Sequence, residues 1–169
     1  MTTLEVVTRI HATPGACFDL ARDVDVHAES LAHAGERVTL RPDHARLRLG
    51  DEVEFEGRHL GVRQRLRARI TAFDRPHHFR DEQVRGAFRS FVHDHEFVPE
   101  ADGTRMTDRI RFQAPGGPLG VLVERVILRP YLTRLIARRG RELKHLAETG
   151  WRNPRKVFRE SPPPSGQDC

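Results

Sequence analysis

The chain has little cysteine, and it lacks any long apolar run. Its 169 residues include only two cysteines, Cys17 and Cys169, so we expect no disulfide framework, and a reducing compartment fits. No window approaches the about 18 uninterrupted apolar residues that indicate a transmembrane helix. The first residues lack a basic region followed by an apolar block, so we expect no secretory signal. Together these absences predict a cytoplasmic protein without membrane insertion.

The basic residues, nearly all arginine, give the chain a net charge of +5. Four of the arginines occupy every second position along one predicted strand, and three glutamates do the same along the strand before it. Residues two apart on a strand share a sheet face, so each of these rows lies on one face. The rows are Arg63, Arg65, Arg67 and Arg69, and Glu52, Glu54 and Glu56. We expect them to pair across the outer surface. No nucleic-acid motif accompanies the charge, so we expect no nucleic-acid partner.

The order of predicted elements indicates an α+β domain. Alternation of apolar and polar residues predicts a first strand over residues 3–12, and two short helices follow it, one starting at Thr13-Pro14 and one over about residues 26–32. Short turns join the later strands, so the sheet should be antiparallel. Those strands are expected at residues 36–41, 51–58, 62–73, 77–85, 89–99 and 104–113.

The C-terminal part changes to helical periodicity. Apolar positions from Leu119 to about residue 149 predict one long helix, which Pro130 should kink or split. An antiparallel sheet with one long helix must bury its concave face against that helix. We therefore expect a domain over residues 1–149. A Pro-rich polar tail, residues 150–169, follows it, and its last ten residues should be disordered.

Histidines and aspartates fall on strand faces that should be buried. His93 and His95 share a face with two phenylalanines, which indicates that this face points inward. A hairpin loop at residues 100–103 would place His95 opposite Asp108, and a turn at residues 86–88 would place His93 opposite Asp81. A carboxylate facing an imidazole is a plausible hydrogen-bonded pair, and it favours the charged form of each group.

The expected site is an apolar concavity with polar groups along one side, as is typical of small-molecule sites. Its polar members are Gln64, Asp81, Gln83, His93, His95 and Asp108. Its apolar members are Phe91, Phe97 and Met106 and, from the first half of the long helix, Leu122 and Val126.

The same residues allow other interpretations. His93 and His95 can be core histidines satisfied by Asp81 and Asp108, with no ligand at all. A His-x-His strand with a facing aspartate can also form a two-histidine, one-carboxylate metal site. Each histidine has a carboxylate neighbour of its own, however, so we expect no metal and no other cofactor. Ser90 faces away from His93, and this argues against a nucleophile–base pair.

Three segments carry a family resemblance: TLEVVTRIHATPGACFDLARD, HHFRDEQVRGAFRSFVHDHEF and GTRMTDRIRFQAPGGPLG, the last before a long Arg-rich helix. They resemble the START and birch-allergen-like helix-grip superfamily, also called SRPBCC, over about residues 3–148. The chain is most similar to the bacterial polyketide cyclase/dehydrase-like, ligand-binding group. The resemblance implies a seven-stranded curved antiparallel sheet wrapped around a long C-terminal helix. It also implies a cavity for a lipid, polyketide, isoprenoid or aromatic compound.

Three functional hypotheses follow. The favoured one is a carrier or sensor that binds a hydrophobic small molecule. The second is a metal-free polyketide cyclase or dehydratase in which His95, held by Asp108, moves protons. The third is an interaction module whose basic outer surface or tail binds a protein partner that the sequence does not identify.

Overall fold

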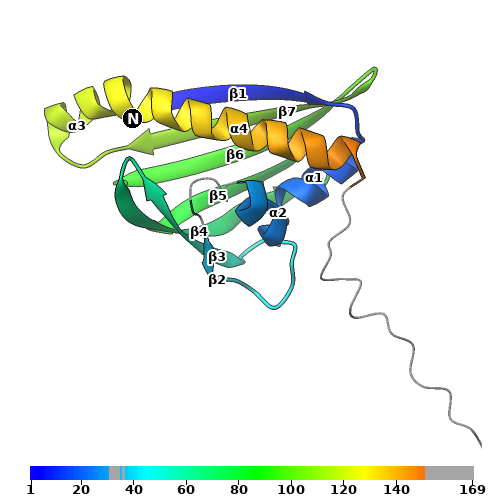
Figure 1. Cartoon of the computed structure of the whole chain (residues 1–169), viewed down its shortest axis with the longest axis horizontal. Coiled ribbons are helices and arrows are strands. Elements are labelled where there is room, and N and C mark those ends of the chain that lie inside the picture. Colours follow the sequence, from blue (N-terminus) through cyan, green and yellow to red (C-terminus); the bar gives the residue numbers. More distant parts are fainter. Residues whose placement is uncertain (31–34, 36, 151–169) are drawn as a thin grey trace, which may run out of the picture.

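The computed structural model describes residues 1–30, 35 and 37–150. A seven-stranded antiparallel sheet curves around a long C-terminal helix (Figure 1), and the predicted α+β helix-grip fold is confirmed. The strand order across the sheet is β1-β7-β6-β5-β4-β3-β2. The strands are β1 (Thr2–Ile10), β2 (Arg37–Leu40), β3 (Glu52–His59), β4 (Val62–Asp74), β5 (His78–Arg85), β6 (Ser90–Glu100) and β7 (Gly103–Gln113).

Two short helices, α1 (Pro14–Ala21) and α2 (Val24–Ser30), follow β1 and contact the long helix. The side chain of Thr13 accepts a hydrogen bond from the Ala16 N–H, and Pro14 occupies the first turn of α1, as its fixed φ favours. The second helix begins two residues before the expected residue 26. Its expected end at residue 32 lies outside the described residues, as does the tail from residue 151 onward.

The C-terminal helical segment has three parts: α3 (Gly117–Val123), the π-helical turn η2 (Glu124–Leu128) and α4 (Arg129–Glu148). Pro130 lies in the first turn of α4, so the predicted interruption takes the form of a widened turn just before the proline, which has no N–H to donate. At Gly140, α4 approaches β1 so closely that a Cβ atom would clash with Thr8 Oγ1. Within the described ranges, no helix combines the length and apolar character needed to cross a membrane.

Ion pairs cover the outer face of β3 and β4. The strand register places Glu54 opposite Arg67 and Glu56 opposite Arg65, as predicted. Arg65 Nε donates to Glu56 Oε2 at 2.6 Å, and Arg67 Nε donates to Glu54 Oε2 at 3.2 Å. The glutamate and arginine rows therefore do neutralise each other across this surface.

Asp94 lies on the outer face of β6, yet its exposed fraction is only 5%. Three basic side chains cover its carboxylate, because Arg80 Nε donates to it at 2.7 Å, His78 Nε2 at 2.9 Å and Arg111 Nη2 at 3.2 Å. The strand register sets Asp94 opposite Arg109. The Arg109 guanidinium nevertheless bonds to other carboxylates.

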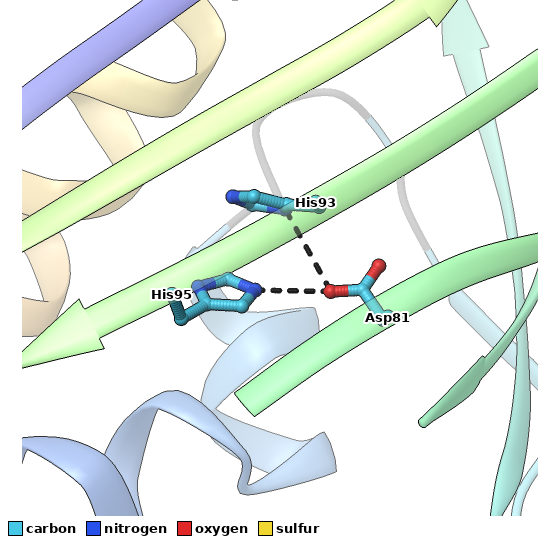
Figure 2. Close-up of side chains that lie close together, drawn as sticks. All are labelled: Asp81, His93 and His95. Atoms are coloured by element: carbon cyan, nitrogen blue, oxygen red, sulfur yellow. Dashed lines mark hydrogen bonds and ion pairs between the residues drawn. The ribbon is translucent and has the colours of Figure 1, made fainter. Parts of the chain in front are cut away.

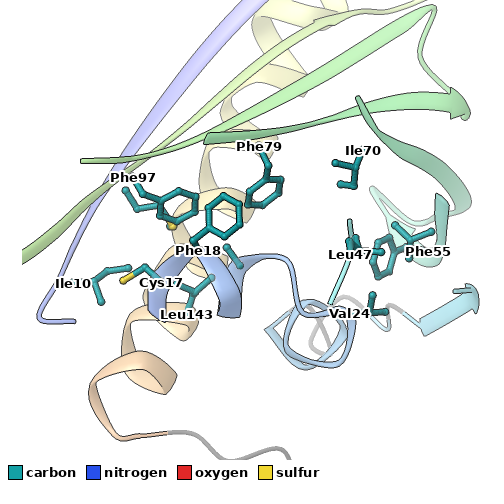
Figure 3. Close-up of a cluster of buried hydrophobic side chains, with 13 residues drawn as sticks. Ile10, Cys17, Phe18, Val24, Leu47, Phe55, Ile70, Phe79, Phe97 and Leu143 are labelled. Carbon is teal, nitrogen blue, oxygen red and sulfur yellow. The ribbon is translucent and has the colours of Figure 1, made fainter. Parts of the chain in front are cut away.

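The apolar core consists of two clusters. In the first, Phe18 of α1 meets Phe79 and Phe97 edge-on, with ring centroids 5.3 and 5.5 Å away (Figure 3). Phe73, which packs against this cluster, also meets Phe18 edge-on, with ring centroids 5.2 Å apart. Such edge-to-face pairs add to the stabilisation from apolar burial. The second cluster joins β1, β6 and β7 to α4, and its buried members are Leu4, Val6, Phe91, Ile110, Phe112, Leu132 and Ile136.

Candidate ligand cavity with a histidine–aspartate cluster

A cavity of about 150 Å³ lies between the concave face of the sheet and α4. Both core clusters contribute to its walls, which are mostly apolar. Representative wall residues are Phe55, Ile70, Phe91, Ile110, Leu132 and Ile136. An apolar cavity of roughly this volume is large enough for one aromatic ring.

Polar side chains gather at one side of the cavity, on β5 and β6. Side chains two residues apart on a strand share a face, and the register sets Asp81 beside His93, so Asp81, His93 and His95 meet. His95 Nε2 donates to Asp81 Oδ2 at 3.0 Å, and His93 Nδ1 lies 3.8 Å from the same oxygen. Figure 2 shows both imidazoles near this one carboxylate oxygen.

Asp108, from β7, lies on the other side of the two imidazoles and does not line the cavity. His93 Nε2 donates to Asp108 Oδ1 at 3.0 Å, and His95 Nδ1 lies 2.8 Å from the same oxygen, at an angle too sharp for a good hydrogen bond. The predicted registers, His95 opposite Asp108 and His93 opposite Asp81, are confirmed. The hydrogen bonds run diagonally, however, so each carboxylate contacts both rings.

The surroundings shift the pKa values of the two imidazoles in opposite directions. Burial lowers the pKa of His93, and the charge of His95 lowers it further. Burial also acts to lower the pKa of His95, but the contacts with the Asp108 and Asp81 carboxylates outweigh it and raise that pKa above its ordinary value. The pKa of Asp108 lies far below its usual range despite burial, because both histidines stabilise the carboxylate. His95 is therefore the more readily protonated ring.

Arg139 of α4 is a cavity residue that the sequence analysis missed. Its exposed fraction is 3%, its Nη2 donates to the Ala21 carbonyl oxygen at 3.1 Å, and its Nη1 donates to Asp108 Oδ1 at 3.5 Å. A signal was present in the sequence. Position 139 lies three residues after Ile136 and four before Leu143, both buried, so an arginine occupies the core-facing stripe of an amphipathic helix.

Three further cavity residues were also missed. His27 of α2 stacks on Phe55 with ring centroids 4.1 Å apart, and burial lowers the pKa of this histidine well below its ordinary value. His59 Nδ1 and the Tyr131 hydroxyl are hydrogen-bonded at 2.8 Å, and both residues line the cavity. Tyr131 follows Pro130 on α4, and no periodicity argument singled out the two histidines.

The other predicted site residues divide into two groups. Gln64 and Phe91 line the cavity together with Asp81, His93 and His95. Phe97 and Met106 are buried in the core beside it, as Asp108 is, and do not line it. The Gln83 side-chain amide donates to the Phe88 carbonyl oxygen at 2.8 Å, and this residue does not line the cavity either.

Leu122 and Val126, expected in the cavity wall, lie outside it. Their exposed fractions are 58% and 64%. The π-helical turn η2, which follows Leu122 and contains Val126, changes the phase of the helix before α4, so the apolar stripe that faces the cavity starts later than predicted. The wall residues from η2 and α4 are Leu128, Tyr131, Leu132, Leu135, Ile136 and Arg139.

The fold and the cavity define a helix-grip protein. A model of the family described as "Polyketide cyclase / dehydrase and lipid transport" matches residues 1–148, and the chain belongs to this family. No curated protein gives a significant match.

Several solved structures share the fold. The protein TTHA0849 from Thermus thermophilus is 17% identical with a TM-score of 0.72, and the match covers 88% of this chain and 99% of that one. Protein Ms6760 from Mycobacterium smegmatis is 18% identical with a TM-score of 0.64, covering 85% and 89%. The major latex-like protein 151 from Panax ginseng is 14% identical with a TM-score of 0.60, covering 86% and 97%. Identities this low show the fold alone.

Proposed function

We propose that this chain binds a hydrophobic small molecule in the cavity between the sheet and α4, as a cytoplasmic carrier or sensor. The observation that carries the proposal is a cavity with mostly apolar walls and a cluster of polar groups, Asp81, His93, His95 and Arg139, at one side. A lipid, polyketide, isoprenoid or aromatic compound with one polar end fits this division. The family description, which names polyketide cyclases and lipid transport, supports the same classes of guest.

The two parts of the cavity have different roles in this proposal. Each Å² of apolar guest surface removed from water contributes about 25 cal/mol, so the walls supply most of the affinity. The polar end fixes orientation, because a guest hydroxyl can donate to the Asp81 carboxylate, which lines the cavity. In this proposal the domain over residues 1–149 binds its guest by itself, without a nucleic-acid partner and without insertion into a membrane.

The test is native mass spectrometry of the protein purified from its own host. We expect a retained hydrophobic compound in the wild type. The variant Ala68→Phe places a ring in the cavity wall and should lose the compound. Val98→Phe adds the same ring on the exposed outer face of β6 and should retain it. Equal retention by both variants, each checked for a native melting transition, would place the guest elsewhere.

A second candidate function is a polyketide cyclase or dehydratase. The observation in its favour is that His95 lines the cavity between the carboxylates of Asp81 and Asp108, which raise its pKa and suit it to donate a proton. The retained compound separates the candidates, because an enzyme converts it during incubation and a carrier leaves its mass unchanged. In an enzyme, His95→Gln should abolish conversion and leave binding nearly intact. Equal losses of both would indicate a role in binding or folding.

A further inference from the structure

Three potential metal ligands meet at the polar end of the cavity. Asp81, His93 and His95 each offer one donor atom, and these atoms lie within 4.8 Å of one another. Asp81 Oδ2 is 3.0 Å from His95 Nε2 and 3.8 Å from His93 Nδ1. Ligands about 2.1 Å from a tetrahedral Zn²⁺ are about 3.4 Å apart, a value between these two distances. We propose that these three residues bind a divalent transition-metal ion, with Zn²⁺ as the best match.

Asp108 supplies the support that metal-binding histidines need. Such histidines almost always donate their other ring N–H to a carboxylate or carbonyl, which fixes the tautomer and the ring orientation. Asp108 Oδ1 is 3.0 Å from His93 Nε2 and 2.8 Å from His95 Nδ1. The hydrogen bond from His93 Nε2 to Asp108 leaves the lone pair of His93 Nδ1 for an ion beside Asp81. In the metal-free chain His95 Nε2 donates to Asp81, so binding an ion requires the His95 proton to move to Nδ1 and the ring to turn slightly toward Asp108 Oδ1, which is already 2.8 Å away. One buried carboxylate is thus within reach of both ligands.

The pairing of histidines and carboxylates in the structure differs from the pairing on which the expectation of no metal was based. There, each histidine had a carboxylate of its own. In the structure both rings contact Asp108 from one side, and Asp81 faces both from the other. With the His93 proton on Nε2, His93 Nδ1 and Asp81 Oδ2 are two acceptors 3.8 Å apart, and a cation between them satisfies both. Two carboxylates and one guanidinium, that of Arg139, leave the cluster a charge of −1 when both rings are neutral, which also favours a cation.

The ligand types select the ion. Two imidazoles and one carboxylate suit Zn²⁺ and its late first-row neighbours, whereas Mg²⁺ and Ca²⁺ prefer all-oxygen sets. Three protein ligands leave a coordination position open toward the cavity. An oxygen at the polar end of the guest can occupy it. This last step rests on the proposed function, but binding of the metal alone does not.

The test uses the full-length, tag-free chain after removal of metals by a chelator. Co²⁺, whose visible absorption reports its ligands, is titrated first, and Zn²⁺ then displaces it. We expect one ion per chain in the wild type and in the control His78→Gln, which alters a histidine beside a carboxylate on the outer face. Asp81→Asn and His93→Gln should each lose at least about 100-fold in affinity. Asp108→Asn should lose about 10- to 100-fold, since it alters only the supporting carboxylate.

X-ray absorption of the Zn²⁺-loaded wild type gives a readout that needs no variant. The proposal expects two imidazoles and oxygen donors around the ion. A sulfur ligand, fewer than two imidazoles, no saturable binding, or unchanged affinity in folded Asp81→Asn and His93→Gln would overturn it. Binding of a hydrophobic fluorophore by the metal-free chain is measured in parallel, so failure of the metal site and failure of the ligand cavity are told apart.

Discussion

Asp108 and Arg139 are charged residues with exposed fractions of 0% and 3%. A buried charge is costly to keep out of water unless it is paired and hydrogen-bonded. Asp108 meets this requirement through His93, His95 and Arg139, and Arg139 meets it through Asp108 and the Ala21 carbonyl. At the residue scale, the charged groups at the polar end of the cavity therefore depend on one another. Removing one of them leaves a buried charge or hydrogen-bonding group of another without its partner.

Replacing Arg139 tests this linkage. Arg139→Leu leaves the buried Ala21 carbonyl without its side-chain donor and removes a positive neighbour from Asp108. We expect the free energy of unfolding to fall by about 1–3 kcal/mol, as for other buried polar groups that lose a partner. The matched control Arg138→Leu alters the neighbouring arginine, which is not fully buried, and should change stability by less than about 0.5 kcal/mol. Urea denaturation measures both, and equal effects would contradict the argument.

The sequence predicts this cluster only in part. The two-residue period of a strand places His93 and His95 on one face, and the hairpin loops set them opposite Asp81 and Asp108. The diagonal hydrogen bonds depend on side-chain torsions and on strand twist, which no pattern encodes. Arg139 was readable from the helical spacing of its buried neighbours, but only after the phase of α4 was known.

Among the elements, the π-helical turn η2 decides where the C-terminal helix meets the sheet. It contains Glu124, which is buried although it is charged. Thr2 Oγ1 donates to Glu124 Oε2 at 2.7 Å, and the Ala114 N–H donates to Glu124 Oε1 at 2.7 Å. One carboxylate thus joins the start of β1, the chain after β7 and the helix. The sequence indicates a break near Pro130, but the form of the break arises from this packing.

Removing that carboxylate should loosen the junction. Glu124→Ala leaves the buried Ala114 N–H unpaired, and we expect the free energy of unfolding to fall by about 2 kcal/mol. Glu142→Ala, an exposed position on α4, is the control and should be near neutral. Guanidinium denaturation gives both values. A Glu124→Ala protein as stable as the control would show that the turn does not depend on this contact.

At the scale of the whole molecule, the sheet separates ion pairs on its outer face from the apolar cavity on its inner face. Other ion pairs tie elements together at the surface. Asp19 of α1 accepts hydrogen bonds from Arg22 at 2.7 Å and from Arg75, just after β4, at 2.9 Å. Burial acts to raise the pKa of Asp19, but these guanidinium groups lower it to about 2.

The pH dependence of stability follows from this shift. A carboxylate whose pKa is lower in the folded state stabilises the fold above its unfolded pKa of about 3.9, and this contribution is lost as the pH falls toward the folded value. Asp94, whose pKa is lowered by Arg80 and His78 despite its burial, acts in the same direction. We therefore expect the melting temperature to decline between about pH 4 and pH 2. The decline should be shallower in Asp19→Asn, and an identical decline in that variant would contradict the assignment.

The central claim is that a hydrophobic guest binds inside the grip of the sheet and α4. Methyl NMR of the labelled protein during titration with naphthol tests it most directly. We predict saturable shifts of the Ile110, Leu132 and Ile136 methyl groups, which face the cavity. Shifts confined to the exposed methyl groups of Leu119, Leu122 and Val126, or no saturable shift at all, would contradict the account.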